Sequence, residues 1–152
     1  MMLKNGNLLK WWLLVVLTAA GVVIVNYFDG IQFVYDNDLT KLSFVIAGLF
    51  LLTSAVVGYK IFTNGDGKYQ NYEAEWLVSE HLLSLGLLGT VGGLCYTFYV
   101  GFNNLDITNI QSAQQVIVAL ANGLSSAFVT TIAGLIFSMI LKSQLVIAEN
   151  ES

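Results

Sequence analysis

Four long apolar runs constrain this chain of 152 residues more than any other feature of its sequence. A membrane-spanning helix needs about 20 apolar residues, because each residue adds about 1.5 Å along the axis and the hydrocarbon layer is about 30 Å thick. The only charged residue within the runs is Lys60, one helical turn from a span end, where its amine can reach the headgroups. We therefore expect an all-α membrane protein with four transmembrane helices. The expected spans cover residues 11–28, 42–62, 82–102 and 116–141.

The composition agrees with a membrane protein rather than with a soluble domain. Hydrophobic residues make up 56% of the chain and charged residues only 11%, whereas a soluble domain has about 25% charged residues. A chain this short cannot enclose so much apolar surface in a core of its own. No proline or linker divides it, so we expect residues 1–152 to form a single transmembrane domain without a separate soluble domain.

Several classes of function are excluded by what the sequence lacks. One cysteine and one histidine do not make a disulfide framework or a zinc site. Six lysines, no arginine and a net charge of −4 leave no basic surface for nucleic acid. No nucleophile is paired with a base, and no glycine-rich phosphate loop is present. We therefore expect neither an enzyme nor a protein that binds a metal, a cofactor or nucleic acid.

The distribution of lysines predicts how the chain is oriented in the membrane. Cytoplasmic loops carry an excess of lysine and arginine. Lys41 is alone in one of the two outer loops, which cover residues 29–41 and 103–115. The sequence therefore predicts a multi-pass protein of the cytoplasmic (inner) membrane with both termini in the cytoplasm. The lysines on the predicted inner side are Lys4, Lys10, Lys60, Lys68 and Lys142.

The third and fourth spans are expected to be parts of longer helices. The fourth apolar run alone would be about 39 Å long as a helix, more than the hydrocarbon layer needs. Before the third span, Tyr69, Tyr72, Trp76 and Leu83 recur at helical spacing. We therefore expect the third helix to begin near Tyr69, after a turn at residues 63–68 whose Asn-Gly and Asp-Gly pairs favour turns.

Small and hydroxyl-bearing residues gather in the third and fourth spans. Their spacing places them on one face of each helix. Such faces are typical of close helix packing in lipid, but they also suit a hydroxyl-lined ion path or a surface that turns against another helix. Spacing alone leaves these alternatives open. The residues are Gly86, Gly89, Thr90, Gly93 and Thr97 in the third span, and Gly123, Ala127, Thr131, Gly134 and Ser138 in the fourth.

No titratable carboxylate or imidazole lies near the middle of any span, although a proton path normally needs one. If the protein conducts protons, another chain must supply that group. Glu80 and His81 lie at the inner edge of the third span, where they could form an entry or exit relay. The alternative is that they are ordinary interfacial residues at a helix start.

Two segments resemble the MotA/TolQ/ExbB proton channel family. Residues 85–94, LGLLGTVGGL, look like the family's G-L-L-G-T-V-x-G-L, and residues 123–135, GLSSAFVTTIAGL, resemble its G-I-x-x-A-L-x-x-T-x-x-G-L. The resemblance covers roughly residues 80–143. It implies that Thr90 and Thr131 correspond to the threonines that line the family's ion pathway. It also matches Gly86, Gly89, Gly93, Gly123 and Gly134 to the family's packing glycines, with Ala127 on the same face.

The resemblance further implies an assembly and a mechanism. Family members form a homopentamer around two copies of a single-span partner of the MotB/TolR/ExbD kind, whose helix carries an essential aspartate. Protons or sodium ions moving through that aspartate drive rotation of one component within the other. The chain would then be the channel-forming subunit of an ion-driven motor, a stator or an energy-transducing complex.

The chain also departs from the family pattern. Leu83 stands where a proline usually precedes the first motif, and Ser126 stands where the TolQ/ExbB branch has a glutamate. The short inner loop lacks the large cytoplasmic domain of the MotA branch, which argues against contact with a flagellar rotor. A structural scaffold or a holin-like protein remains an alternative function, whereas a small-solute transporter is disfavoured because no span contains a broken helix or a charge near its middle.

Overall fold

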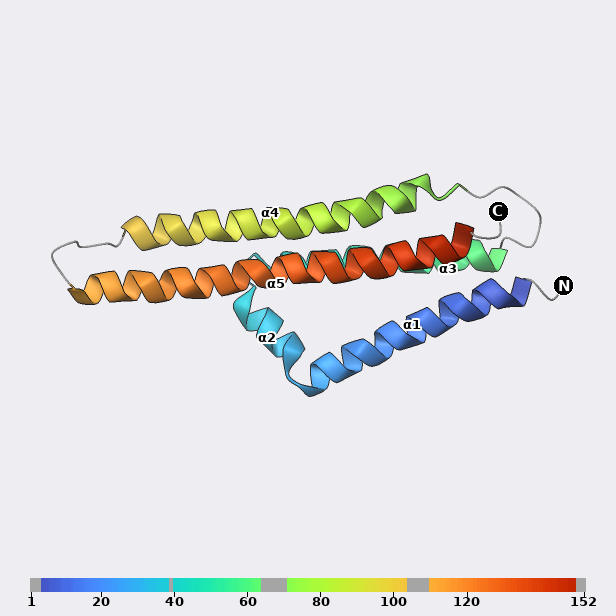
Figure 1. Ribbon diagram of the computed structural model, residues 1–152, viewed down its shortest axis with the longest axis horizontal. Helices are drawn as coiled ribbons and strands as arrows, with labels where there is room; N and C mark the ends of the chain where they lie inside the picture. Colours follow the sequence, from blue (N-terminus) through green and yellow to red (C-terminus); the bar gives the residue numbers. More distant parts are fainter. Residues whose placement is uncertain (1–3, 39, 64–70, 104–109, 150–152) are drawn as a thin grey trace.

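The computed structural model describes residues 4–38, 40–63, 71–103 and 110–149, in which the chain is helical and contains no strand (Figure 1). Four of the helices are long and apolar enough to cross a membrane, and only α2 is not. This confirms the expected all-α class with four candidate spans. The helices are α1 (Lys4–Tyr27), α2 (Gly30–Asn37), α3 (Leu42–Thr63), α4 (Glu73–Asn103) and α5 (Ile110–Glu149).

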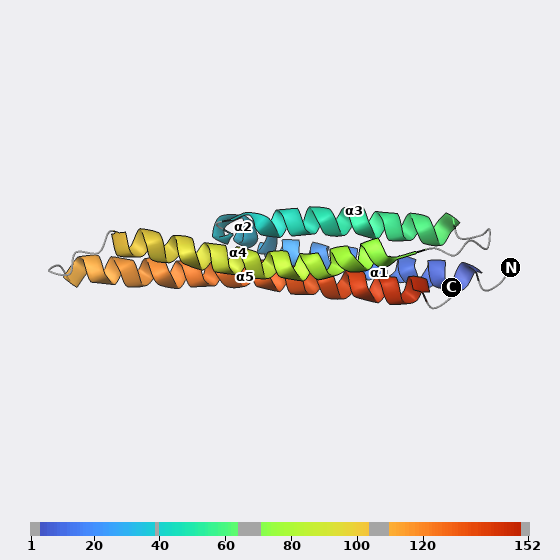
Figure 2. The same ribbon diagram turned by 90° about the horizontal axis from the view of Figure 1, so that it is seen from above.

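An antiparallel pair, α4 and α5, forms the axis of the molecule (Figures 1 and 2). We call the end where α1 begins, α3 ends, α4 begins and α5 ends the terminal end, and the opposite end, where α4 ends and α5 begins, the hairpin end. From the terminal end, α1 diverges from the other helices, and none of its apolar window is buried. Most of its surface is therefore available to lipid or to another chain.

The helix α3 covers only the half of the α4–α5 pair that lies nearer the terminal end (Figure 2). Leu42, its first residue, lies against Gly89 and therefore near the middle of α4. Further along, the rings of Phe50 on α3 and Phe137 on α5 pack with centroids 4.9 Å apart. The buried core consequently lies in the terminal half. It comprises Ile46, Phe50, Val57, Ile61, Tyr72, Leu82, Leu141, Leu145 and Ala148.

Both helices of the central pair are longer than the apolar runs that predicted them. α4 begins at Glu73, more than two turns before the expected span, and α5 continues for about two turns beyond Leu141 to Glu149. The chain contains no proline that would end either helix earlier. The expected helix start at Tyr69 and most of the expected turn at residues 63–68 lie outside the described residues.

The first predicted outer loop, residues 29–41, is instead mostly helical. α2 occupies Gly30–Asn37, and its amides begin to bond at once, with Phe33 N donating to Asp29 O at 2.8 Å. Asp29 has a left-handed φ of 55°, which reverses the chain sharply after α1. Gly30 is needed in this turn because a Cβ there would lie 2.8 Å from the carbonyl oxygen of Val25. The apolar residues of this short segment were too few to predict a helix.

Asp38 is buried rather than exposed as an outer-loop residue. Its side chain is 2% exposed and accepts hydrogen bonds from Thr40 N at 3.1 Å, Thr40 Oγ1 at 2.9 Å and Ser43 N at 2.9 Å. Amides in the first turn of a helix have no partner within the helix. The Asp38 carboxylate therefore caps the start of α3.

The central pair is held together where two glycines remove the side chains between backbones. A Cβ built on Gly134 of α5 would lie 3.0 Å from the Cα of Gly86 and 2.8 Å from the carbonyl oxygen of Leu82, both on α4. A Cβ on Gly86 would lie 3.0 Å from the carbonyl oxygen of Thr130. Backbone atoms cannot move aside as a flexible side chain can, so α4 and α5 approach this closely only with glycine at both positions.

We predict that Gly134→Ala lowers the free energy of unfolding by about 1–3 kcal/mol, because the added methyl group must push the two backbones apart. Gly92→Ala is the matched control, since Gly92 is exposed and a Cβ there meets nothing within 4 Å. Unfolding of the purified protein in mixed micelles measures both changes. Equal effects of the two substitutions would contradict the close approach.

Candidate ion pathway

The side chains of Thr90 on α4 and Thr131 on α5 meet directly. Their Oγ1 atoms are hydrogen-bonded to each other although the residues are 41 positions apart in the sequence. Thr90 Oγ1 also lies 2.9 Å from the carbonyl oxygen of Ala127 and 3.0 Å from that of Gly86. Both threonines are partly exposed, so the pair lies at the edge of the contact between the helices. The structure thus brings together the two threonines that the sequence selected.

The two hydroxyls have more acceptors around them than protons to donate. Each hydroxyl carries one proton and can accept two hydrogen bonds. Thr90 can donate to Ala127 O, to Gly86 O or to Thr131 Oγ1, but to only one of them at a time. When Thr90 donates to a carbonyl, Thr131 can donate to Thr90. The two hydroxyls can therefore exchange the roles of hydrogen-bond donor and acceptor while both helices stay in place.

The small residues predicted to pack are all buried between α4 and α5, and they set how close the threonines come. Gly86 lies one turn before Thr90, and a Cβ on Gly89 would touch the side chain of Thr130 at 3.0 Å. Further toward the hairpin end, a Cβ on Gly123 would overlap the side chain of Thr97, whereas Gly93 and Ala127 leave ordinary contact distances. Within one chain these residues face the other helix of the pair.

Glu80 and His81, the candidate inner relay, lie on α4 away from the threonine pair. Both are exposed, and neither forms an ion pair with any residue that the structure describes. The carbonyl oxygen of Glu80 accepts a hydrogen bond from Ser84 Oγ at 3.1 Å. Their role as a relay stays a prediction.

Comparison with known protein families identifies this region. Residues 82–146, which run from α4 through most of α5, match the model of the MotA/TolQ/ExbB proton channel family. This segment belongs to that family. The match confirms the resemblance of residues 85–94 and 123–135, and both threonines lie inside it. No curated protein and no solved structure matches the chain.

The match makes residues 82–146 similar to membrane subunits of the proton-channel type. Members of this family are channels and energy transducers rather than enzymes, and they oligomerise and work with a partner protein. Within residues 82–102 and 116–141 the sequence contains no aspartate, glutamate, histidine or lysine. The hydroxyl pair is therefore a polar feature of the segment that carries no charge of its own.

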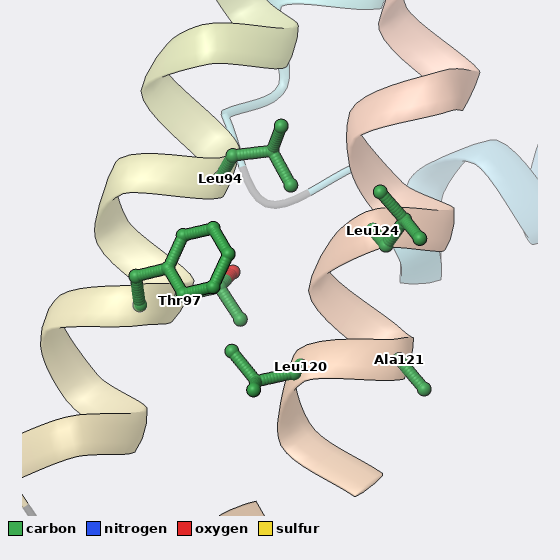
Figure 3. A pocket seen from close by; sticks show the side chains of 6 residues that line it. Leu94, Thr97, Leu120, Ala121 and Leu124 are labelled. Carbon is green, nitrogen blue, oxygen red and sulfur yellow. The ribbon is translucent and has the colours of Figure 1, made fainter. Parts of the chain in front are cut away.

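A shallow apolar groove lies on the MotA/TolQ/ExbB segment between the threonine pair and the hairpin end (Figure 3). Its volume is about 210 Å³. The one hydroxyl in its wall, that of Thr97, donates to the carbonyl oxygen of Gly93 at 2.8 Å. The groove therefore suits an apolar group rather than an ion. Its lining residues are Leu94, Thr97, Phe98, Leu120, Ala121 and Leu124.

Polar contacts that the sequence did not reveal join the helices at the terminal end. Lys60 Nζ forms an ion pair with Glu75 Oε1 at 2.5 Å and donates a hydrogen bond to Asn71 O at 2.8 Å. Trp76 Nε1 donates to Glu149 Oε1 at 2.5 Å. The helical spacing of the aromatic residues before the third span was the one signal for these contacts, because it extends α4 far enough to present Glu75 and Trp76.

Tyr72 lies just before α4 in this group, with Lys60 Nζ 5.2 Å from the centre of its ring. Burial raises the pKa of the Tyr72 hydroxyl above its ordinary value of 10.0, and the negative charges of Glu75 and Glu149 raise it further. The hydroxyl therefore keeps its proton at physiological pH.

We predict that the hydroxyls of Thr90 and Thr131 couple across α4 and α5 by about 0.6 kcal/mol, within the range of roughly 0.6–2 kcal/mol for such bonds between helices in membranes. A double-mutant cycle with Thr90→Val and Thr131→Val, read by unfolding in mixed micelles, measures the coupling. Thr90→Val with Thr18→Val is the control cycle, because the Thr18 hydroxyl donates to Val15 O within α1. A coupling energy equal to that of the control would show that the contact contributes nothing.

We also predict a pH dependence from Tyr72. Because the folded state holds the phenol proton more tightly than the unfolded state, this contribution to stability is complete below about pH 10 and is lost as the pH rises from there through the folded pKa. Tyr72→Phe should therefore show a smaller fall in melting temperature between pH 9 and 11 than the wild type. Tyr59→Phe, at an exposed position, should retain the wild-type profile. Identical profiles for all three proteins would contradict this role of Tyr72.

Proposed function

We propose that the chain is the channel-forming subunit of an ion-driven motor or energy-transducing complex, with the proton as the transported ion. The observation that carries this proposal is the hydroxyl pair of Thr90 and Thr131 within the segment that matches the family. The pair is partly exposed at the edge of the α4–α5 contact, so an ion or a partner helix can reach it without entering a closed core.

The carboxylate that a proton path needs must come from another chain. The spans in the matched segment carry no aspartate, glutamate, histidine or lysine, and a hydroxyl alone does not hold a proton charge across a bilayer. We propose that a single-span partner with an aspartate in its helix supplies it. The protonated aspartate could donate to Thr90 or Thr131, and the ionised form could accept from either hydroxyl. The Thr90–Thr131 pair could therefore form a hydrogen bond with the partner's aspartate in both its protonated and its ionised state.

The hairpin half of the central pair favours an oligomer. Asn122 and Ser125 on α5 are exposed there, beyond the stretch that α3 covers. An exposed amide facing lipid is costly, because lipid offers no hydrogen-bond partner. Further copies of the chain, or the partner, would cover these side chains. We propose a homopentamer around two partner helices, with both termini of each chain in the cytoplasm.

Ion flow through such a complex can perform mechanical work. One proton crossing 100 mV releases about 2.3 kcal/mol. Neutralising the partner's aspartate would change which of the surrounding Thr90–Thr131 pairs holds it most tightly, and the inner helices would then turn within the ring. Only residues 64–72 join α3 to α4, far fewer than the large cytoplasmic domain of the MotA branch would need. We therefore propose that the partner, rather than a cytoplasmic loop of this chain, transmits the mechanical work to the process that it drives.

Subunit counting tests the assembly. We expect native mass spectrometry of the detergent-purified chain to give five copies. When the chain is co-expressed with a neighbouring reading frame that encodes one apolar span with a buried aspartate, we expect two copies of that partner to join the five. A monomer, a dimer or an open-ended series with no partner would instead favour the structural scaffold or holin-like alternative.

A flux assay tests the pathway. We predict that Thr131→Ala in the complex with its partner, in liposomes with a membrane potential, reduces proton flux by about tenfold, equivalent to about 1.4 kcal/mol in the barrier. Thr18→Ala deletes the same hydroxyl from α1 and should leave the flux unchanged. Flux that depends on a sodium gradient rather than on a pH gradient would overturn the choice of ion, and unchanged flux with Thr131→Ala would overturn the role of the pair.

A further inference from the structure

Buried polar atoms without hydrogen-bond partners gather at the terminal end of the molecule. Six such atoms occur in the part of the chain that the structure describes, and five of them lie there: Trp11 Nε1, Tyr72 OH, Glu75 Oε2 and both polar atoms of Gln144. The sixth, Ser43 Oγ, lies at the start of α3. Gln144 is 0% exposed, Tyr72 3% and Glu75 5%. They come from α1, from the start of α4 and from α5, so they do not reflect an irregularity of one helix.

Contacts in the structure place these groups around one small region. Lys60 on α3 joins Glu75 and lies over the ring of Tyr72. Tyr72 belongs to the same buried cluster as Leu141 and Leu145, which lie on either side of Gln144 along α5. The ring of Trp11 packs on Gly58, one turn before Ile61 of that cluster.

The closed packing leaves these atoms in an unfavourable state. A buried donor or acceptor that forms no hydrogen bond has lost its water without replacement. The atoms have essentially no accessible surface, so neither lipid nor a partner chain can reach them while the helices stay as they are. Tyr72 keeps its proton because its pKa is raised, so its hydroxyl still requires an acceptor. Opening the packing to water would satisfy the group.

Three polar contacts hold the region closed from outside. Lys60 on α3 forms an ion pair with Glu75 and donates a hydrogen bond to Asn71 O just before α4, and Trp76 on α4 donates a hydrogen bond to Glu149 at the end of α5. Glu149 is exposed and the Lys60 side chain is 26% exposed, whereas the Glu75 side chain is 7% exposed. Water can therefore compete for one partner of each contact, and the contacts can break without unfolding the helices.

We propose that the terminal end is a water gate, in which the start of α4 separates from α3 and α5 and admits water to Gln144, Tyr72 and Glu75. The Lys60–Glu75 and Trp76–Glu149 contacts are the latches of this gate, because both must break before α4 can separate. Apolar burial of Ile61 and Leu145 favours the closed state, and hydration of the unpaired polar atoms favours the open one. The gate concerns access of water to the interior of one chain, so it does not depend on the proposed ion flow.

Hydroxyl-radical labelling of the full-length protein in nanodiscs tests this gate, because radicals formed from water oxidise only side chains that water reaches. We expect Tyr72 in the wild type to be oxidised several times faster than Phe50, an aromatic residue equally buried in the same core. Trp76→Phe removes the latch donor but keeps a ring, and it should raise the labelling of Tyr72 severalfold without changing that of Phe50. Equal rates at Tyr72 and Phe50, unaffected by Trp76→Phe, would overturn the proposal.

A second variant tests the origin of the opening. Gln144→Met keeps the length of the side chain and removes both unpaired polar atoms, so it should slow the labelling of Tyr72 and raise the melting temperature by roughly 2–4 °C. A lower melting temperature would mean that Gln144 is hydrogen-bonded within the closed protein, with the polar atoms pairing among themselves. That result would also overturn the gate. Both readouts are independent of the partner and of ion flux.

Discussion

In a bilayer no hydrophobic force draws one helix to another, so α4 and α5 hold together through close contact of their backbones. The approach at Gly86 and Gly134 is the closest part of that contact, and the rest of the site depends on it. Thr90 follows Gly86 by about one turn, and Thr131 precedes Gly134 by about one turn. Their hydroxyls therefore meet only while the two backbones touch. The geometry of the candidate pathway is therefore a property of the packing rather than of the threonines alone.

The two halves of the molecule are stabilised differently. Toward the terminal end, three helices enclose an apolar core, and polar contacts between Lys60, Glu75, Trp76 and Glu149 join the helix ends. Toward the hairpin end, α4 and α5 have no cover from α3 among the described residues. The first half can thus hold its shape in a single chain, whereas the second exposes surface that suits association. This division agrees with a subunit that packs internally at one end and assembles at the other.

Much of the fold could be predicted because the bilayer imposes strict lengths on apolar runs, and the four spans follow from those lengths alone. Periodicity also placed Thr90 and Thr131 on the small-residue faces of their helices, since residues separated by three or four positions share a helix face. The resemblance to the family then singled out these two threonines. The sequence did not predict α2, whose eight residues owe their helix to a left-handed Asp29 and a tight approach at Gly30. Nor could it predict the partners of Lys60 and Trp76. Such pairings depend on the register between helices that are distant in the sequence.

The glycine contact between α4 and α5 also limits how chains of this kind can change in length. One residue inserted between Gly86 and Thr90 would rotate everything after it by about 100° around the helix axis. Thr90 would then leave the face that meets α5, although every residue of both motifs would still be present. Insertions and deletions are therefore tolerable in the connections between helices but not within the paired stretches. The spacing between each threonine and the glycine of its own motif is in this sense as much a part of the site as the residues themselves.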